Sequence, residues 1–110
     1  MALLPLPLVQ GTLDLLVLRT LQGGPMHGYG IAVMIRERTA GDLNIEDAAL
    51  YQSLHRLDRQ NLVAAEWRQS DNNRRARYYR LTAEGRKRLR ADTASWQRYA
   101  RAVDAVLQGG

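Results

Sequence analysis

Arginines and tyrosines are concentrated between residues 74 and 80 of this 110-residue chain. Four arginines and two tyrosines share these seven positions, and the turn-forming run Ser70–Asn73 comes directly before them. A guanidinium group is always charged and presents a planar fork of N–H donors that matches phosphate oxygens. Turn formers between two strand-like runs predict a β-hairpin. We therefore expect a basic hairpin whose phosphate-binding side chains are Arg74, Arg75 and Arg77.

A second set of polar side chains lies on one side of a predicted helix that is capped by Asn44 and ends at Asn61. Leu50, Leu54 and Leu57 have the spacing of a buried helical stripe. The opposite side carries residue types that can hydrogen-bond to base edges or phosphates, with a solvated polar face as the alternative. These DNA-binding candidates are Tyr51, Gln52, His55 and Arg56.

The charge of the chain is unevenly distributed. The net charge is +5 and the pI about 10.2, and residues 74–90 contain eight basic residues and one acid. Such asymmetry favours a polyanionic partner, either nucleic acid or an anionic membrane, over a merely solvated surface. Taken together with the hairpin, the charge favours nucleic acid.

Several classes of protein are disfavoured by what the sequence lacks. Without cysteine there are no disulfides, thiolate metal sites or cysteine nucleophiles, which fits a cytoplasmic location. The two histidines lie on different predicted elements, and no glycine-rich phosphate loop is present, so we expect no metal, no cofactor and no enzyme. There is no run of 18 apolar residues and only a poor signal peptide, so we expect no membrane partner.

The remaining segments must position these side chains. Helical spacing predicts helices over residues 12–22 and 31–39, with Thr12 as an N-cap and His27 at the start of the second helix. Gly28 and Gly30 are expected to allow a neighbouring helix to approach closely. Residues 62–68 and 76–81 alternate as half-buried strands, and Trp67 is expected to pack at the base of the hairpin.

Three helices followed by a hairpin and a last helix are the order of a winged helix-turn-helix protein, a mainly α (α+β) fold. We expect this domain over residues 1–82, with residues 1–10 as a short arm. Residues 83–110 are expected to form a dimerisation helix within the same compact unit, with Thr82 as its N-cap.

The last predicted helix carries a seven-residue apolar repeat. At 25 residues it would span roughly 37 Å, longer than so small a domain needs. The repeat indicates lengthwise packing against a second helix, and therefore a homodimer. A long helix packed back on its own domain is the alternative. The predicted interface residues are Leu89, Trp96, Ala100, Val103 and Leu107, with Thr93 as the weak position of the repeat.

Four motifs in fixed order resemble one family of bacterial transcriptional regulators, the PadR family, over about residues 8–107. The motifs are Gly11-Thr12-Leu13, His27-Gly28-Tyr29-Gly30, Ala49-Leu50-Tyr51, and the run from Arg77 to Gly85. The hairpin at residues 72–79 is similar to that of the acidobacterial branch. The resemblance implies a dimeric winged-helix repressor. It also implies a possible planar aromatic effector stacked on Trp96, although that ring could simply fill the dimer interface.

Two residues depart from the family pattern. Gln52 stands where proline is usual, and it should be well tolerated because a proline inside a helix removes a hydrogen bond. Its amide could also read adenine. Asn61 stands where glycine is frequent, and asparagine tolerates the same left-handed backbone.

The leading hypothesis is a homodimer that binds a pseudo-palindromic site in double-stranded DNA and represses transcription. The alternative is a winged-helix module that binds another protein without sequence-specific DNA binding. RNA binding is disfavoured because stacking platforms for single strands are sparse in the sequence.

Overall fold

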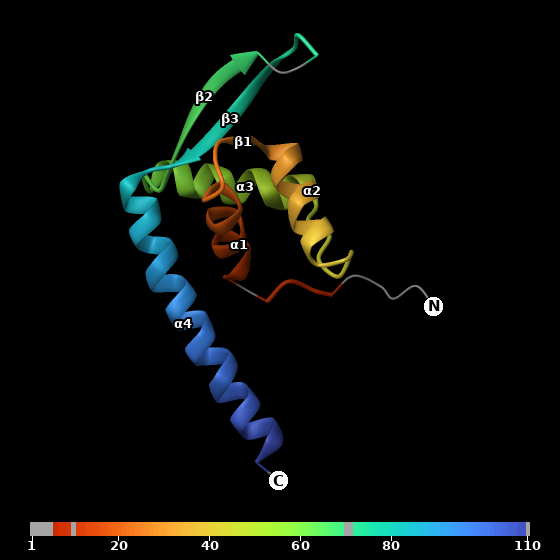
Figure 1. The fold of residues 1–110 in the computed structure, drawn as a ribbon, viewed down its shortest axis with the longest axis vertical. Coiled ribbons are helices and arrows are strands. Elements are labelled where there is room, and N and C mark those ends of the chain that lie inside the picture. The colour runs from red at the N-terminus through yellow and green to blue at the C-terminus, as the bar shows by residue number, and fades with distance from the viewer. Residues whose placement is uncertain (1–5, 10, 70–71, 110) are drawn as a thin grey trace.

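The computed structural model describes residues 6–9, 11–69 and 72–109, so Ser70, Asp71 and most of the expected arm lie outside the described residues. Four helices and three strands follow the winged-helix order and confirm the predicted fold (Figure 1). The elements are α1 (Thr12–Leu21), β1 (Met26–His27), α2 (Gly28–Arg38), α3 (Asp47–Arg59), β2 (Val63–Gln69), β3 (Arg75–Leu81) and α4 (Ala83–Gln108).

The sheet contains one strand that the sequence analysis did not predict. Strand order is β1-β3-β2, and both pairings are antiparallel. β1 pairs Met26 with Tyr79 and His27 with Tyr78, so it ties the start of α2 to the hairpin. Two residues are too few to show the alternating pattern by which strands are recognised in a sequence.

A core of aliphatic side chains lies where the helices meet the base of the hairpin. Leu50, Leu54 and Leu57 of α3 are almost completely buried, which confirms the predicted stripe. Val63 and Leu81 are paired across β2 and β3 and are also buried. The hairpin therefore grows directly out of the core, and its outer half projects beyond the helices (Figure 1).

Side-chain caps define the start of two helices, by Thr82 at α4 as predicted and by His27 at α2, which begins at Gly28 rather than at residue 31. The amide of Gly85 donates to the Thr82 hydroxyl at 2.9 Å, and the amide of Gly30 donates to His27 Nδ1 at 3.0 Å. Each bond satisfies one of the free amide groups at a helix start. Asn61, in the left-handed conformation with φ 62°, follows α3 as expected.

The predicted caps of the other two helices were wrong. Gly11, with φ 87°, is the N-cap residue of α1, and the Thr12 hydroxyl donates instead to the carbonyl of Val9 at 2.6 Å. α3 begins at Asp47 after the N-cap residue Glu46, so Asn44 precedes the helix without capping it. Neither helix has a side-chain hydrogen bond at its N-cap. The sequence therefore contains no capping residue from which the first residue of α1 or α3 could be predicted.

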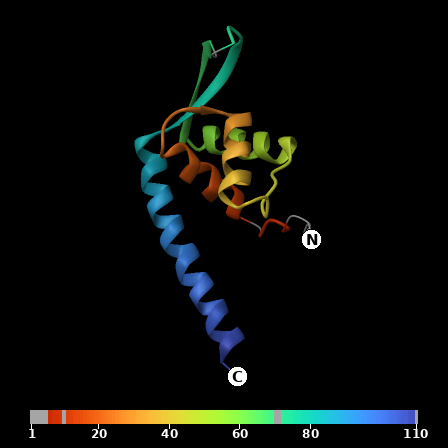
Figure 2. The same ribbon diagram turned by 45° about the vertical axis from the view of Figure 1, so that its right-hand side comes forward.

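α4 divides into a part packed on the domain and a part that extends away from it. Gly85 lies so close to the Leu62 carbonyl that a Cβ atom there would overlap it, and Leu89 is only 3% exposed. The helix continues beside α1, with which Trp96 and Tyr99 line a groove, and then extends away from the domain. Its C-terminal end and the hairpin project in opposite directions (Figures 1 and 2). The alternative of a helix packed back on its own domain therefore applies only to the N-terminal part of α4.

Candidate nucleic-acid interface

The exposed face of α3 carries three of its four predicted DNA-binding residues. Tyr51, Gln52 and His55 all lie on the surface, whereas Leu54 on the other side is buried. Tyr51 is 51% exposed although it is a large aromatic residue. The helix therefore presents hydrogen-bonding side chains outward from a face that the core fixes in orientation.

Tyr51 is positioned by a glycine of α2. A Cβ atom added to Gly28 would come within 2.9 Å of the Tyr51 hydroxyl oxygen and 3.0 Å of its ring carbons. The expected close approach of a neighbouring helix at Gly28 is therefore present, and the neighbour is α3. At Gly30 the expectation was wrong, because the atoms nearest to an added Cβ belong to Met26 and His27 of β1. Any larger residue at position 28 would displace the Tyr51 ring.

Arg75 and Arg77 of the hairpin lie on the face that continues the buried face of the sheet. Trp67 pairs with Arg77, on the face that Val63 and Leu81 occupy at the hairpin base. The guanidinium carbons of Arg75 and Arg77 lie 5.2 and 6.0 Å from the centre of the Trp67 ring, within the range of cation–π contacts. Arg74, just before β3, is exposed.

Trp67 does not pack at the base of the hairpin, contrary to the prediction. Its ring is 57% exposed, because residues near the strand end extend beyond the reach of the core. Alternation along a strand predicts which face a side chain occupies, but not where along the strand burial stops.

Two open grooves bring the hairpin and the helices together. The larger, about 870 Å³, lies between β2, β3 and the start of α2, and Tyr51, Arg74, Arg75 and Arg77 line it. The smaller, about 380 Å³, is lined by Tyr51, Gln52, His55 and Arg77, among others. Tyr51 and Arg77 belong to both grooves. Six of the seven predicted DNA-binding residues thus line adjoining grooves on α3 and the hairpin.

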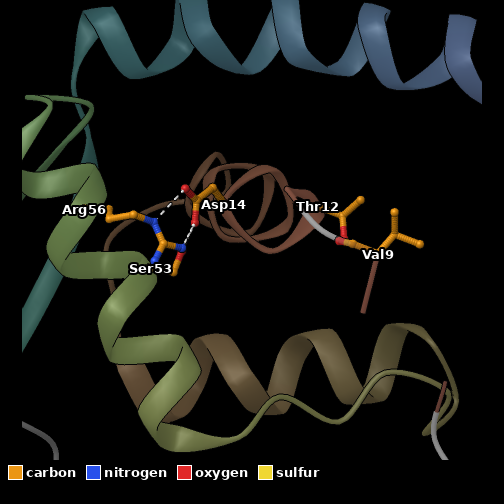
Figure 3. Close-up of polar contacts among 5 residues, drawn as sticks. All are labelled: Val9, Thr12, Asp14, Ser53 and Arg56. Atoms are coloured by element: carbon orange, nitrogen blue, oxygen red, sulfur yellow. Dashed lines mark hydrogen bonds and ion pairs between the residues drawn. The ribbon is translucent and has the colours of Figure 1, made fainter. Parts of the chain in front are cut away.

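Arg56 lines neither groove because it is paired with an acid of α1 (Figure 3). Its Nη2 donates to Asp14 Oδ1 at 2.7 Å and its Nε donates to Asp14 Oδ2 at 3.3 Å. The buried Ser53 hydroxyl donates to the same carboxylate at 2.5 Å. The predicted role of Arg56 as a DNA reader was based on its helix face, which does not reveal a partner 42 residues away. The carboxylate clamp formed by Asp14, Ser53 and Arg56 joins α1 to α3.

Two groups near the interface have perturbed acidities. The hydrogen bond and the charge of Asp14 raise the pKa of Arg56 above its ordinary value, so the guanidinium stays charged throughout the physiological range. Burial raises the pKa of Tyr79 above 10.0, against the opposing effect of Arg77. The Tyr79 phenol is therefore neutral at physiological pH and adds no negative charge beside the arginines.

A third groove of about 580 Å³ lies between the start of α1 and α4. Trp96, 38% exposed, and Tyr99 line it on α4, and Gly11, Thr12 and Leu15 line it on α1. Farther along α4, Val103, Val106 and Leu107 are exposed to solvent. α4 thus presents several large apolar side chains outside the core.

Within the described ranges, no three His, Cys, Asp or Glu side chains are grouped closely enough to hold a metal ion. None of the helices described is both long enough and apolar enough to cross a membrane.

Comparisons with known proteins agree with this architecture. The model of the transcriptional regulator PadR-like family matches residues 17–91. A PadR family transcriptional regulator from Eggerthella lenta is 33% identical, with a TM-score of 0.79 over 92% of this chain and 86% of that one. A PadR family regulator from Clostridium difficile is 28% identical, with a TM-score of 0.77 over 88% of this chain and 99% of that one. An uncharacterized protein of Lysinibacillus sphaericus is 26% identical over 93% of this chain and 94% of its own length.

We predict that the carboxylate clamp stabilises the contact between α1 and α3. In a double-mutant cycle of Asp14→Ala and Arg56→Ala, the coupling free energy should be about 1 kcal/mol, because the atoms are only partly shielded from solvent. Urea unfolding of the four proteins measures it. The Glu66–Arg68 pair, with a similar distance of 2.8 Å but greater exposure, is the matched control and should give a smaller coupling. Equal coupling energies for the two pairs would contradict the prediction.

Proposed function

The chain belongs to the PadR-like family of transcriptional regulators, and from this premise we propose that it is a homodimeric repressor that binds a pseudo-palindromic DNA operator. Members of the family regulate transcription and are not enzymes. The observation that carries the DNA-binding part of the proposal is the shared surface of α3 and the hairpin. Polar and basic side chains from both elements line adjoining grooves there.

The two elements have different tasks in this proposal. α3 enters the major groove, where Gln52 and His55 contact base edges and Tyr51 donates its hydroxyl to a phosphate. The hairpin acts as the wing, and Arg74, Arg75 and Arg77 bind phosphates beside it. Sequence preference comes from α3, and most of the affinity comes from the wing.

Arg56 takes a positioning role rather than a reading role. Its guanidinium is held by Asp14, and breaking that pair to reach DNA would leave the carboxylate without its cation. The clamp instead fixes the turn of α3 that follows Tyr51 and Gln52. Its contribution to DNA binding is therefore the orientation of the helix.

Dimerisation through α4 is supported by the apolar side chains that its C-terminal half exposes. Trp96, Val103 and Leu107 belong to the seven-residue repeat and lie outside the core, while Ala100 is partly exposed. Leu89 is left out of the proposed interface because it is already buried in the core of its own chain. We assign DNA binding to residues 1–82 and dimerisation to residues 83–110.

The effector part of the proposal rests on the groove beside Trp96. An aromatic side chain next to an open space of about 580 Å³ can stack a planar molecule. A ligand bound there would contact α4 and α1 at once, and so could change the geometry of the dimer. As a regulator of bacterial genes, the protein would act in the cytoplasm, where the DNA lies.

Removing one wing arginine should weaken DNA binding and reduce its dependence on salt. Each phosphate contact contributes about 0.9 to the slope of log K against log salt concentration, so Arg75→Ala should lower the slope by about 1. Fluorescence anisotropy with a selected duplex, at several salt concentrations, measures both. The matched control is Arg98→Ala, which removes an exposed arginine of α4. Because Arg98 lines neither groove on α3 and the hairpin, this change should leave the slope unchanged. A wild-type slope for Arg75→Ala would remove Arg75 from the DNA contacts.

An acid placed in the α4 repeat should dissociate the dimer. Val103→Asp would bury a charge without a partner and should weaken dimerisation at least about 100-fold. Sedimentation equilibrium gives the dissociation constant. Ala105→Asp puts the same group on the opposite side of the helix and should leave the dimer intact. A Val103→Asp protein that remains dimeric at wild-type affinity would contradict an interface through this face.

Planar aromatic compounds should quench the fluorescence of Trp96. We expect saturable quenching by members of a panel of planar dyes and drugs, because a ring stacked on indole lies within contact distance of it. Trp96→Phe should abolish this quenching, whereas Trp67→Phe should retain it. Absence of saturable quenching across the panel would leave Trp96 as a packing residue of the interface.

A further inference from the structure

Trp67 is a large aromatic side chain that neither the core nor the proposed dimer interface uses. It lies on the wing, 57% exposed, while Val63 on the same face of the same strand is buried. A tryptophan left mostly in water in the outer half of a hairpin exposes apolar area that no described contact of the folded chain covers. Its position points to a partner that reaches this part of the wing.

The surroundings of Trp67 define the chemistry of that partner. The large groove that it lines also contains Arg75 and Arg77 and, on the helix side, Tyr29, which is 70% exposed, and Tyr51. None of the described residues lining the groove is acidic. Cations alternating with aromatic surfaces suit a chain in which anionic groups alternate with apolar ones, and a DNA strand has phosphates and deoxyribose rings in that arrangement.

The contacts of the two arginines fix where Trp67 would meet such a strand. The guanidinium carbons of Arg75 and Arg77 lie 5.2 and 6.0 Å from the centre of the Trp67 ring, so phosphates bound by these arginines would lie next to the indole. Arg77 lies between this ring and two other partners, with its guanidinium carbon 6.0 Å from the centre of the Tyr79 ring and its Nη2 3.9 Å from Asp58 Oδ2. The ring is thus positioned for the sugar between two phosphates rather than for a base inside the stack. Cation–π contacts at exposed sites are weak, so holding the two arginines does not by itself explain why an exposed tryptophan stands at position 67.

We propose that one strand of duplex DNA passes through this groove and that Trp67 packs against a deoxyribose of that strand, between the phosphates held by Arg75 and Arg77. The proposal rests on the proposed DNA-binding function and adds an apolar contact to it. It makes Trp67 a DNA-binding residue that adds affinity without neutralising a phosphate.

This contact can be separated from the arginine contacts by its salt dependence. Trp67→Ala should bind the selected duplex about tenfold more weakly, equivalent to about 1.4 kcal/mol, at every salt concentration. The slope against salt should remain that of the wild type, because an apolar contact releases no counterion. Trp67→Phe should stay within about threefold of wild-type affinity. The Ala variant should also melt near the wild-type temperature, since most of the ring lies outside the core.

Fluorescence gives an independent readout of the same contact, because the chain has two tryptophans. Saturating duplex should protect Trp67 from acrylamide quenching in Trp96→Phe, in which it is the remaining tryptophan. In Trp67→Phe, where Trp96 is the remaining tryptophan, the duplex should give little protection.

Three results would overturn the proposal in distinguishable ways. A wild-type protein that binds no duplex would overturn the proposed function itself. Wild-type binding with unchanged affinity in Trp67→Ala would overturn only the role of Trp67. A loss of affinity accompanied by the same reduction in salt slope as in Arg75→Ala would show that Trp67 acts only by holding the arginines, and would overturn the deoxyribose contact.

Discussion

Helix α1 contacts α2, α3, α4 and β3, and its Val17 and Leu18 side chains are completely buried. The other elements are placed around this helix by the removal of its apolar surface from water, which is the largest favourable term in folding. Asp14 of α1 orients α3 through polar contacts. Hydrophobic packing is not directional, whereas a carboxylate bound to both Ser53 and Arg56 favours one alignment of α3. The polar face of α3 therefore has a defined direction.

The sequence was sufficient for the order of the four helices and the two hairpin strands, because the apolar spacing of helices and the turn formers of the hairpin are local signals. Leu50, Leu54 and Leu57 specified the buried side of α3 in this way. The missed features are of two kinds. β1 is too short to carry a pattern, and the starts of α1 and α3 have no capping side chain that could be recognised.

The candidate site was predictable where it depended on which face of an element a residue occupies. Gln52, His55 and Arg77 were assigned to exposed faces of the helix and hairpin by that reasoning alone, and all three line the grooves. Arg56 and Trp67 required the tertiary structure, since one depends on an acid from α1 and the other on how far the core extends beneath the wing. Leu89 shows the same limit, because a heptad repeat does not reveal where packing within one chain ends.

The wing strand and α4 follow one another without a linker. β3 ends at Leu81, Thr82 caps the next helix, and Gly85 packs against the Leu62 carbonyl, so the junction has no residue free to act as a hinge. A rod of 26 residues is about 39 Å long. If the helix turns as a rigid body about its C-terminal end, a tilt of about 5° displaces its N-terminal end, next to the wing, by about 3 Å. This is about the length of a hydrogen bond. In a dimer held through α4, an angular change too small to break the interface would thus be amplified mechanically into a change of fit between the two wings and DNA.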